Sequence, residues 1–351
     1  ELFFLINFSV QENLENTIDY LKEFCPRGNM KGFFVPDSGD FETRSWRQQA
    51  KLIRSVKIKE VNPDAIILTS LFEPLGSRVL SEIDEFKCYQ IVILYDLIPY
   101  EDPETYLTRE KDRKNYKRSI HQLLKSDLIL SISNYTTNIF LKNFCERFTA
   151  PVVTIGAATE KKISPGNVLK ECQFDALGKF GIEKEFILTI SGQDKRKNLK
   201  TLLLAFSSLP HSERKRIQLV VVCDMESSVI NSFEDKFAFN SEIQNEVIFT
   251  GPVKEDDLDL LYSNCELFVF PSTMEGFGLP VLEAMSFGCP CVVSNSTSLP
   301  ELVGDAAVKF DATNVSELKR KISELIFDTS KLNTLSKLSV EKSKQYDWSD
   351  V

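Results

Sequence analysis

Two glutamates and two glycines stand close together in the segment 267–301, which reads LFVFPSTMEGFGLPVLEAMSFGCPCVVSNSTSLPE. Glu275 precedes Gly276 and Gly278, and Glu283 follows with seven residues between the two glutamates. Glycines let the backbone approach a ligand closely, and the free N–H groups at a helix start favour phosphate oxygens. Ionised carboxylates accept hydrogen bonds from hydroxyl groups. These residue types favour a ligand with both phosphates and sugar hydroxyls, such as a nucleoside diphosphate sugar.

The elements around this loop follow from the apolar pattern. Residues 267–270 predict a buried strand, and a helix over 280–287 begins with a proline, which suits the first helical position. Gly288 is able to adopt the left-handed conformation that ends helices, and 290–294 predict a second strand. Open α/β sheets bind ligands at the carboxyl ends of their strands, where this loop lies. The alternative is that Glu283 interacts only with the helix dipole and that the glycines only make a turn.

A second concentration of charge follows a strand predicted at 186–190. Residues 191–198 read SGQDKRKN and precede a helix predicted at 199–208. Arg196 presents a fork of donors to two phosphate oxygens, Lys197 adds a point charge, and the helix start adds N–H donors. This pattern predicts a diphosphate site, with an ordinary exposed basic loop as the alternative.

The string PSTMEGFGLPVLEAM resembles the E-x7-E signature of retaining glycosyltransferases with the GT-B fold, of the family 4 type. The following SNSTSLPELVGDAAVKFD continues the family pattern, and QDKRKN resembles the element whose Arg and Lys hold the donor pyrophosphate. Gln193 stands where many relatives have another Arg. The strings SLFE and YDLIPY resemble the mannosyltransferase branch, in which His often replaces Tyr95. The resemblance covers nearly the whole chain and is strongest over 186–311.

The resemblance implies roles for individual residues. Glu275 would hold sugar hydroxyls and steady an oxocarbenium-like centre, and Glu283 would hold the ribose hydroxyls. Asp96 would contact the sugar or the acceptor, the alternative being a carboxylate that caps a loop. The expected donor-binding set also includes Arg196, Lys197, Gly276, Phe277, Gly278, Leu279 and Val253, the last through backbone groups near the nucleobase. Neither a metal ion nor a cofactor is expected, because the basic pair and the helix ends supply the positive charge.

The GT-B resemblance implies an α/β chain with two facing Rossmann-like domains built on parallel sheets, and 351 residues suffice for two cores. We expect an amino-terminal acceptor domain at 1–157, a linker at 158–184 and a carboxy-terminal donor domain at 185–351, closed by a helix over 315–327. The family's first strand and glycine-rich loop are not visible before the strand that starts near Glu1. The amino-terminal domain is therefore expected to be incomplete and the chain a fragment of a longer protein.

Charge and hydropathy limit the classes of partner that the chain could bind. The net charge of −9 argues against nucleic acid, because binding a phosphate backbone needs a basic surface. No apolar run approaches the ~18–20 residues of a membrane span. A helix over 111–124 is rich in Lys and Arg and predicts a solvated face, with an acceptor-phosphate or membrane-surface role as the alternative.

The eight cysteines form no C-x-x-C pair and only two histidines are present, which argues against a zinc site. Cys223, Cys289 and Cys291 lie in or beside apolar strand runs and are predicted to be reduced core residues. The expected location is the cytoplasm, with attachment to the inner face of the membrane as the alternative.

The function that the resemblance implies is retaining transfer of a hexose from a nucleoside diphosphate sugar to a hydroxyl of a glycan or a lipid-linked glycan, in polysaccharide biosynthesis. Mannose from GDP-mannose is the preferred choice. Two alternatives stay open. One is a non-catalytic module that binds a sugar nucleotide or a glycan within a larger polymerase, and the other is a GT-B nucleotide-sugar epimerase.

Overall fold

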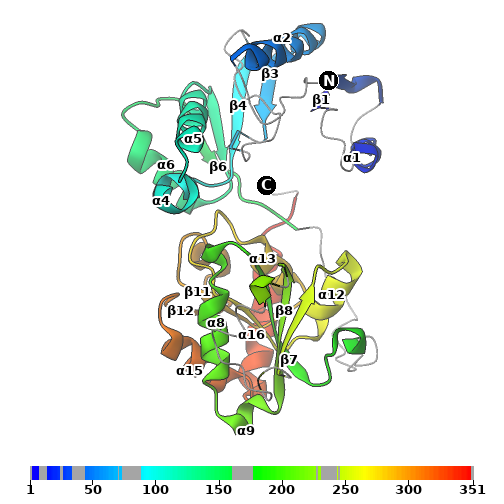
Figure 1. Ribbon diagram of the computed structural model, residues 1–351, viewed down its shortest axis with the longest axis vertical. Helices are drawn as coiled ribbons and strands as arrows, with labels where there is room; N and C mark the ends of the chain where they lie inside the picture. Colours follow the sequence, from blue (N-terminus) through cyan, green and yellow to red (C-terminus); the bar gives the residue numbers. More distant parts are fainter. Residues whose placement is uncertain are drawn as a thin grey trace. The chain divides into compact units, whose positions relative to one another are not determined.

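The structure is a computed structural model and describes residues 2–7, 14–23, 27–33, 44–69, 71–72, 88–159, 177–226, 228–230, 243 and 246–348. The chain divides into two compact units, the first formed by Glu1–Ser131 and Thr137–Thr154 and the second by Ile132–Thr136 and Ile155–Val351 (Figure 1). Most of the linker predicted at 158–184 lies outside the described residues, which resume at Leu177.

The first unit is built on a sheet of four parallel strands in the order β3-β4-β5-β6. The strands are β3 (Ala65–Leu68), β4 (Tyr89–Leu94), β5 (Leu128–Ser131) and β6 (Val152–Thr154). The helices are α2 (Arg44–Val61), α3 (Ile98–Glu101), α4 (Pro103–Tyr106), α5 (Glu110–Leu123) and α6 (Asn134–Phe144). A separate parallel pair, β1 (Phe4–Asn7) and β2 (Met30–Phe33), accompanies α1 (Leu14–Leu21).

Aromatic side chains fill the core of this unit. Phe140 lies between Phe144 and Phe148, with ring centroids 5.3 and 5.2 Å away, and all three side chains are buried. They pack with Leu94 and Ile129 of the sheet. On α5 the cationic side chains are exposed, which confirms the predicted solvated face: Lys111, Arg113, Lys114, Lys117 and Arg118.

The second unit is built on a sheet of six parallel strands. The strands are β7 (Glu185–Gly192), β8 (Ile217–Asp224), β9 (Val247–Gly251), β10 (Leu267–Phe270), β11 (Cys291–Ser294) and β12 (Val308–Phe310). The helices are α8 (Leu199–Ser207), α9 (His211–Arg214), α12 (Glu255–Asn264), α13 (Leu279–Ser286), α14 (Leu299–Val303), α15 (Val315–Leu325) and α16 (Thr329–Ser343).

Both faces of this sheet are covered by helices, as Figure 1 shows. One apolar cluster joins the sheet to α12, α13 and α14, and a second joins its other face to α8 and α15. Alternate residues of β8 enter the two clusters, for example Val220 the first and Val221 the second. A strand buried on both faces has no polar face, which explains the unbroken apolar run in the sequence.

The strand order β12-β11-β10-β7-β8-β9 determines where a ligand can bind. From β7 the chain moves outward through β8 and β9, then returns to β10 beside β7 and continues in the other direction. The connections after β7 and β10 therefore diverge from neighbouring strands, and such a switch point opens a crevice at the carboxyl ends of the strands. The two segments that must meet there are 193–198 and 271–278.

The predicted core positions of Cys223, Cys289 and Cys291 are confirmed, because all three side chains are buried. The prediction that the helix over 315–327 closes the second unit is wrong, since α16 follows α15.

Within the described ranges, none of the helices is both long enough and apolar enough to cross a membrane. Across the same part of the chain, His, Cys, Asp and Glu side chains form no group of three that could hold a metal ion.

Candidate active site

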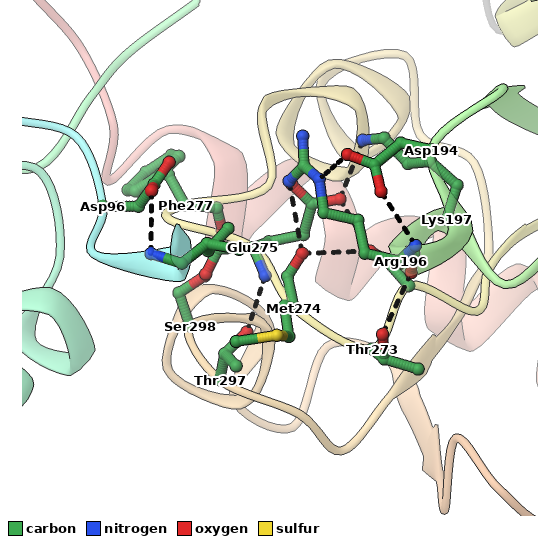
Figure 2. A network of polar contacts seen from close by, with 12 residues as sticks. Asp96, Asp194, Arg196, Lys197, Thr273, Met274, Glu275, Phe277, Thr297 and Ser298 are labelled. Atoms are coloured by element: carbon green, nitrogen blue, oxygen red, sulfur yellow. Dashed lines mark hydrogen bonds and ion pairs between the residues drawn. The ribbon is translucent and has the colours of Figure 1, made fainter. Parts of the chain in front are cut away.

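The basic pair is positioned by a short turn after β7. Asp194 accepts a hydrogen bond from the Arg196 backbone N at 3.0 Å and caps the 3-10 turn Lys195–Lys197. The same carboxylate accepts from Arg196 Nε at 2.8 Å, which fixes the plane of the guanidinium group (Figure 2). Arg196 is thus held through its main chain and its side chain by one acidic neighbour.

The carboxylate of Glu275 lies against this basic pair. Its Oε2 accepts from Arg196 Nη1 at 3.0 Å, and its Oε1 accepts from Lys197 Nζ at 2.8 Å (Figure 2). The same Oε1 also accepts from Ser272 Oγ at 2.7 Å. Glu275 is only 7% exposed, and a buried charge of this kind needs such partners. The structure therefore brings together three residues that the sequence assigned to one site, from segments about 79 positions apart.

Asn198 joins the two loops of the switch point. It adopts the left-handed conformation with φ +52°, which Asn tolerates better than most residues. Its Nδ2 donates to the carbonyl oxygens of Pro271 at 3.0 Å and Ala312 at 2.9 Å, while Thr273 N donates to Arg196 O at 2.7 Å. The loop after β10 is therefore fastened directly to the turn that carries the basic pair.

The segment after β11 clamps the glycine-rich loop from the other side. Glu275 N donates to Thr297 Oγ1 at 2.9 Å, and Ser298 Oγ lies 2.9 Å from Glu275 O and 3.0 Å from Phe277 O (Figure 2). Thr297 has φ +49°, a strained value for a β-branched residue that costs about 1–3 kcal/mol. Strain of this kind is concentrated at functional sites, because surrounding contacts must hold it.

Gly278 makes the turn from the loop into α13. Its φ is +109°, and a Cβ at this position would lie 2.6 Å from Leu299 Cδ2 and 3.2 Å from Leu302 Cδ2. Gly276, Phe277 and Gly278 are buried, whereas Leu279, the first residue of α13, is 44% exposed. The predicted helix start is thus shifted by one residue, with the proline at the second helical position.

Replacing Gly278 with alanine is expected to lower the free energy of unfolding by about 1–3 kcal/mol, because the left-handed backbone is strained for alanine and α14 leaves no room. Urea denaturation measures this loss. Gly178→Ala is the control, since a Cβ there meets nothing within 4 Å and the backbone does not have positive φ. Equal stability of the two variants would contradict the assigned role of Gly278.

Glu283 lies on α13 and takes no part in the ion pairs described around Glu275. Its Oε2 accepts a hydrogen bond from the hydroxyl of Tyr262 on α12 at 3.1 Å, and its side chain is half-buried. Val253 follows β9, two strands from β7, and packs against the apolar cluster that includes α12 and α13. The structure places the predicted ribose-binding and base-binding residues outside the ion pairs around Glu275, and their roles stay predictions.

Asp96 lies in the first unit, just after β4. Its Oδ1 accepts from Ile98 N at 3.0 Å, a local contact two residues along the loop, just before α3, whose N-cap is Leu97. The capping contact that the sequence offered as the alternative is therefore present. The contact of Asp96 with a sugar or an acceptor stays a prediction.

The sequence reasoning missed four polar side chains that hold the site together: Asp194, Ser272, Thr297 and Ser298. A signal for the last two is present in the sequence, because the polar run 295–298 follows a buried strand. β11 lies beside β10 in the sheet, so its carboxyl end reaches the same edge as the glycine-rich loop. The sequence alone did not show that β11 and β10 are neighbours in the sheet.

Much of the chain is similar to known proteins. Residues 175–341 match the family described as "Glycosyl transferases group 1". The Serotype-specific mannosyltransferase WbdA of Escherichia coli is 27% identical over 312 residues, which cover 88% of this chain and 38% of that protein. The O-antigen chain mannosyltransferase B of Escherichia coli is 32% identical over 74% of this chain and 66% of its own length. The chain thus spans well under half of the WbdA relative.

Solved structures share the fold. Anabaena Alr3699/HepE in complex with UDP and glucose has a TM-score of 0.70 at 20% identity, covering 98% of this chain and 94% of that one. At this identity the likeness establishes the fold alone. The switch-point site, the family match and the relatives point in one direction, and the chain belongs to the GT-B glycosyltransferases of group 1, as a mannosyltransferase-like member.

Proposed function

We propose that the chain transfers a hexose, with mannose as the preferred choice, from a nucleoside diphosphate sugar to a hydroxyl of a glycan or a lipid-linked glycan. The observation that carries the proposal is the convergence of Arg196, Lys197 and Glu275 at the switch point of the second sheet. The relatives named as mannosyltransferases support the choice of sugar. GDP-mannose is the donor that we propose to test first.

The basic pair would stabilise the charge that develops on the departing diphosphate. Donors fixed before the reaction are effective because they need no reorganisation as charge develops. Arg196 is fixed by Asp194, and Lys197 also lies over the ring of Phe270, 5.1 Å from its centroid. We propose that this positive charge makes a metal ion or another cofactor unnecessary.

The proposal includes retention of anomeric configuration. The acceptor hydroxyl would attack the anomeric carbon on the face from which the diphosphate leaves. The new carbon–oxygen bond forms as the bond to the phosphate oxygen breaks, and that phosphate oxygen takes the acceptor proton. Glu275 would then accept hydrogen bonds from the sugar hydroxyls. NMR of the product linkage, compared with the anomeric configuration of the donor, tests this part.

GDP is expected to stabilise the protein against heat. A ligand at about a hundredfold over its Kd adds ~2.7 kcal/mol to the free energy of unfolding, which a thermal-shift assay resolves. The shift should be the same in EDTA and in MgCl2, and GMP should give a smaller shift because it lacks the second phosphate. A wild-type protein stabilised by none of GDP, UDP and ADP would overturn the proposed function.

Product analysis separates the alternatives. With GDP-mannose and a mannoside acceptor, the proposal predicts a lengthened glycan. Nucleotide binding without turnover would favour the binding module, and conversion of the donor without acceptor would favour an epimerase. The cytoplasmic location is part of the same proposal.

A further inference from the structure

Tyr262 is a buried tyrosine whose hydroxyl meets a predicted ligand-binding carboxylate. It lies on α12, is 1% exposed, and its OH donates to Glu283 Oε2 at 3.1 Å, with Pro280 O at 3.3 Å. Its ring stacks on Phe287 at 5.7 Å and meets Phe268 edge-on at 5.7 Å. The ring is packed on both sides, so its hydroxyl presents a fixed donor to α13.

A hydrogen bond from the Tyr262 hydroxyl is well suited to orienting the Glu283 carboxylate. Burial, reinforced by the negative charge of Glu283, raises the pKa of Tyr262 well above 10, so its hydroxyl stays protonated and donates. A carboxylate has about four acceptor positions, so one bond from Tyr262 leaves capacity for ligand hydroxyls. A side chain with three rotatable bonds, such as glutamate, loses orientational freedom when one oxygen is held in this way.

The hydrogen bond between Tyr262 and Glu283 joins two helices that each follow a segment predicted to bind the nucleotide. Glu283 lies in the second turn of α13, the helix that begins directly after the glycine-rich loop. Tyr262 comes from α12, which follows β9 and the segment that contains Val253. One hydroxyl therefore couples the helix after the phosphate-binding loop to the helix after the predicted base-binding segment.

We propose that Tyr262 is a positioning residue that fixes the Glu283 carboxylate to accept both ribose hydroxyls of the donor, and so selects ribonucleotides over deoxyribonucleotides. The inference rests on the proposed function, in which the donor is a nucleoside diphosphate sugar. Tyr262 itself touches no substrate in this scheme and acts through Glu283.

The experiment measures the affinity of GDP and of 2′,3′-dideoxy-GDP by calorimetry, with UDP and 2′,3′-dideoxy-UDP in parallel. For wild type, the ribonucleotide should bind at least about tenfold more tightly than its dideoxy form, as expected for hydrogen bonds to a charged group. Tyr262→Phe should lose about tenfold in ribonucleotide affinity and keep the dideoxy affinity within about twofold. In the transfer assay its donor KM should rise while kcat holds.

Tyr346→Phe is the matched control, because the Tyr346 hydroxyl donates to a backbone carbonyl, Leu302 O at 3.3 Å, instead of a carboxylate. It should keep the wild-type preference for ribose. If Tyr262→Phe fails to fold, Glu283→Asp withdraws the carboxylate from the tyrosine by one methylene and should also lose the preference.

The outcomes separate the two claims. A wild type that binds none of the diphosphates would overturn the proposed function and this inference with it. A wild type that binds and prefers ribose, with the same preference in Tyr262→Phe or in Glu283→Asp, would overturn the inference alone. An equal loss of ribonucleotide and dideoxy affinity in Tyr262→Phe would show a purely structural role and would also reject it.

Discussion

Replacing Glu275 with glutamine is expected to slow sugar transfer by about 10²–10³ and, at the same time, to tighten the binding of GDP. In the structure the Glu275 carboxylate is ion-paired with the two cations that are proposed to bind the diphosphate, at 3.0 Å from Arg196 and 2.8 Å from Lys197. The diphosphate must therefore share these cations with Glu275. Glutamine keeps the side-chain volume and an oxygen for Ser272, but it removes the competing negative charge.

The expected gain in GDP affinity is about tenfold, or about 1.4 kcal/mol. Calorimetry measures the affinity, and the transfer assay with GDP-mannose measures kcat. Glu324→Gln is the control, because it removes the same charge from an exposed pair with Arg320 on α15. It should change neither quantity. If Glu275→Gln bound GDP more weakly than wild type, the carboxylate would be organising the basic pair and not competing with the phosphates.

The elements of the second unit could be predicted from the sequence because its strands are buried. The predicted bounds of β10 are those of the structure, and the left-handed conformation expected of Gly288 is present, with φ +74°. α16 was missed, since Thr329–Ser343 carries Ser, Thr and Lys around a few apolar positions and buries only Leu332 and Ser339 fully. Local pattern is informative where one face is strongly apolar and weak where it is not.

The contacts of the site could not be predicted in the same way. The sequence assigned Arg196 and Lys197 to phosphate and Glu275 to sugar, and it gave no reason to expect that they pair with one another. That pairing follows from the strand order, which places β10 beside β7 although β8 and β9 lie between them in the chain. Strand order depends on packing among all the strands, so no window of sequence contains it. The strained φ of Thr297 has the same origin, because a hydrogen bond from Glu275, in the loop after the neighbouring strand β10, holds it.

Replacing Arg196 with alanine is expected to weaken GDP binding by about a hundredfold, and Arg196→Lys by at least about tenfold. The guanidinium bonds to Asp194 through Nε and to Glu275 through Nη1, and an ammonium group cannot make both contacts in this geometry. Calorimetry at low and high salt measures the effect. The salt dependence should decrease in Arg196→Ala, because one cation fewer meets the phosphates.

Lys195 supplies the matched control, because it carries the same charge in the same turn and its side chain is exposed. Lys195→Ala should reduce GDP affinity by no more than about twofold, since exposed charges are screened. An equal loss in Lys195→Ala and Arg196→Ala would mean that a diffuse positive field binds the nucleotide, and the built site proposed for Arg196 would be rejected.

The two predictions are linked through the buried carboxylate. Arg196→Ala leaves Glu275, 7% exposed, with Lys197 as its remaining cation among those contacts, and an underpaired buried charge destabilises the fold. The stability lost in Arg196→Ala should therefore be partly restored in the double variant with Glu275→Gln, although its GDP affinity should stay low. A double-mutant cycle by urea denaturation measures this coupling, which we expect to be about 1–3 kcal/mol. Additive losses would show that the ion pair between Arg196 and Glu275 contributes nothing to the stability of the fold.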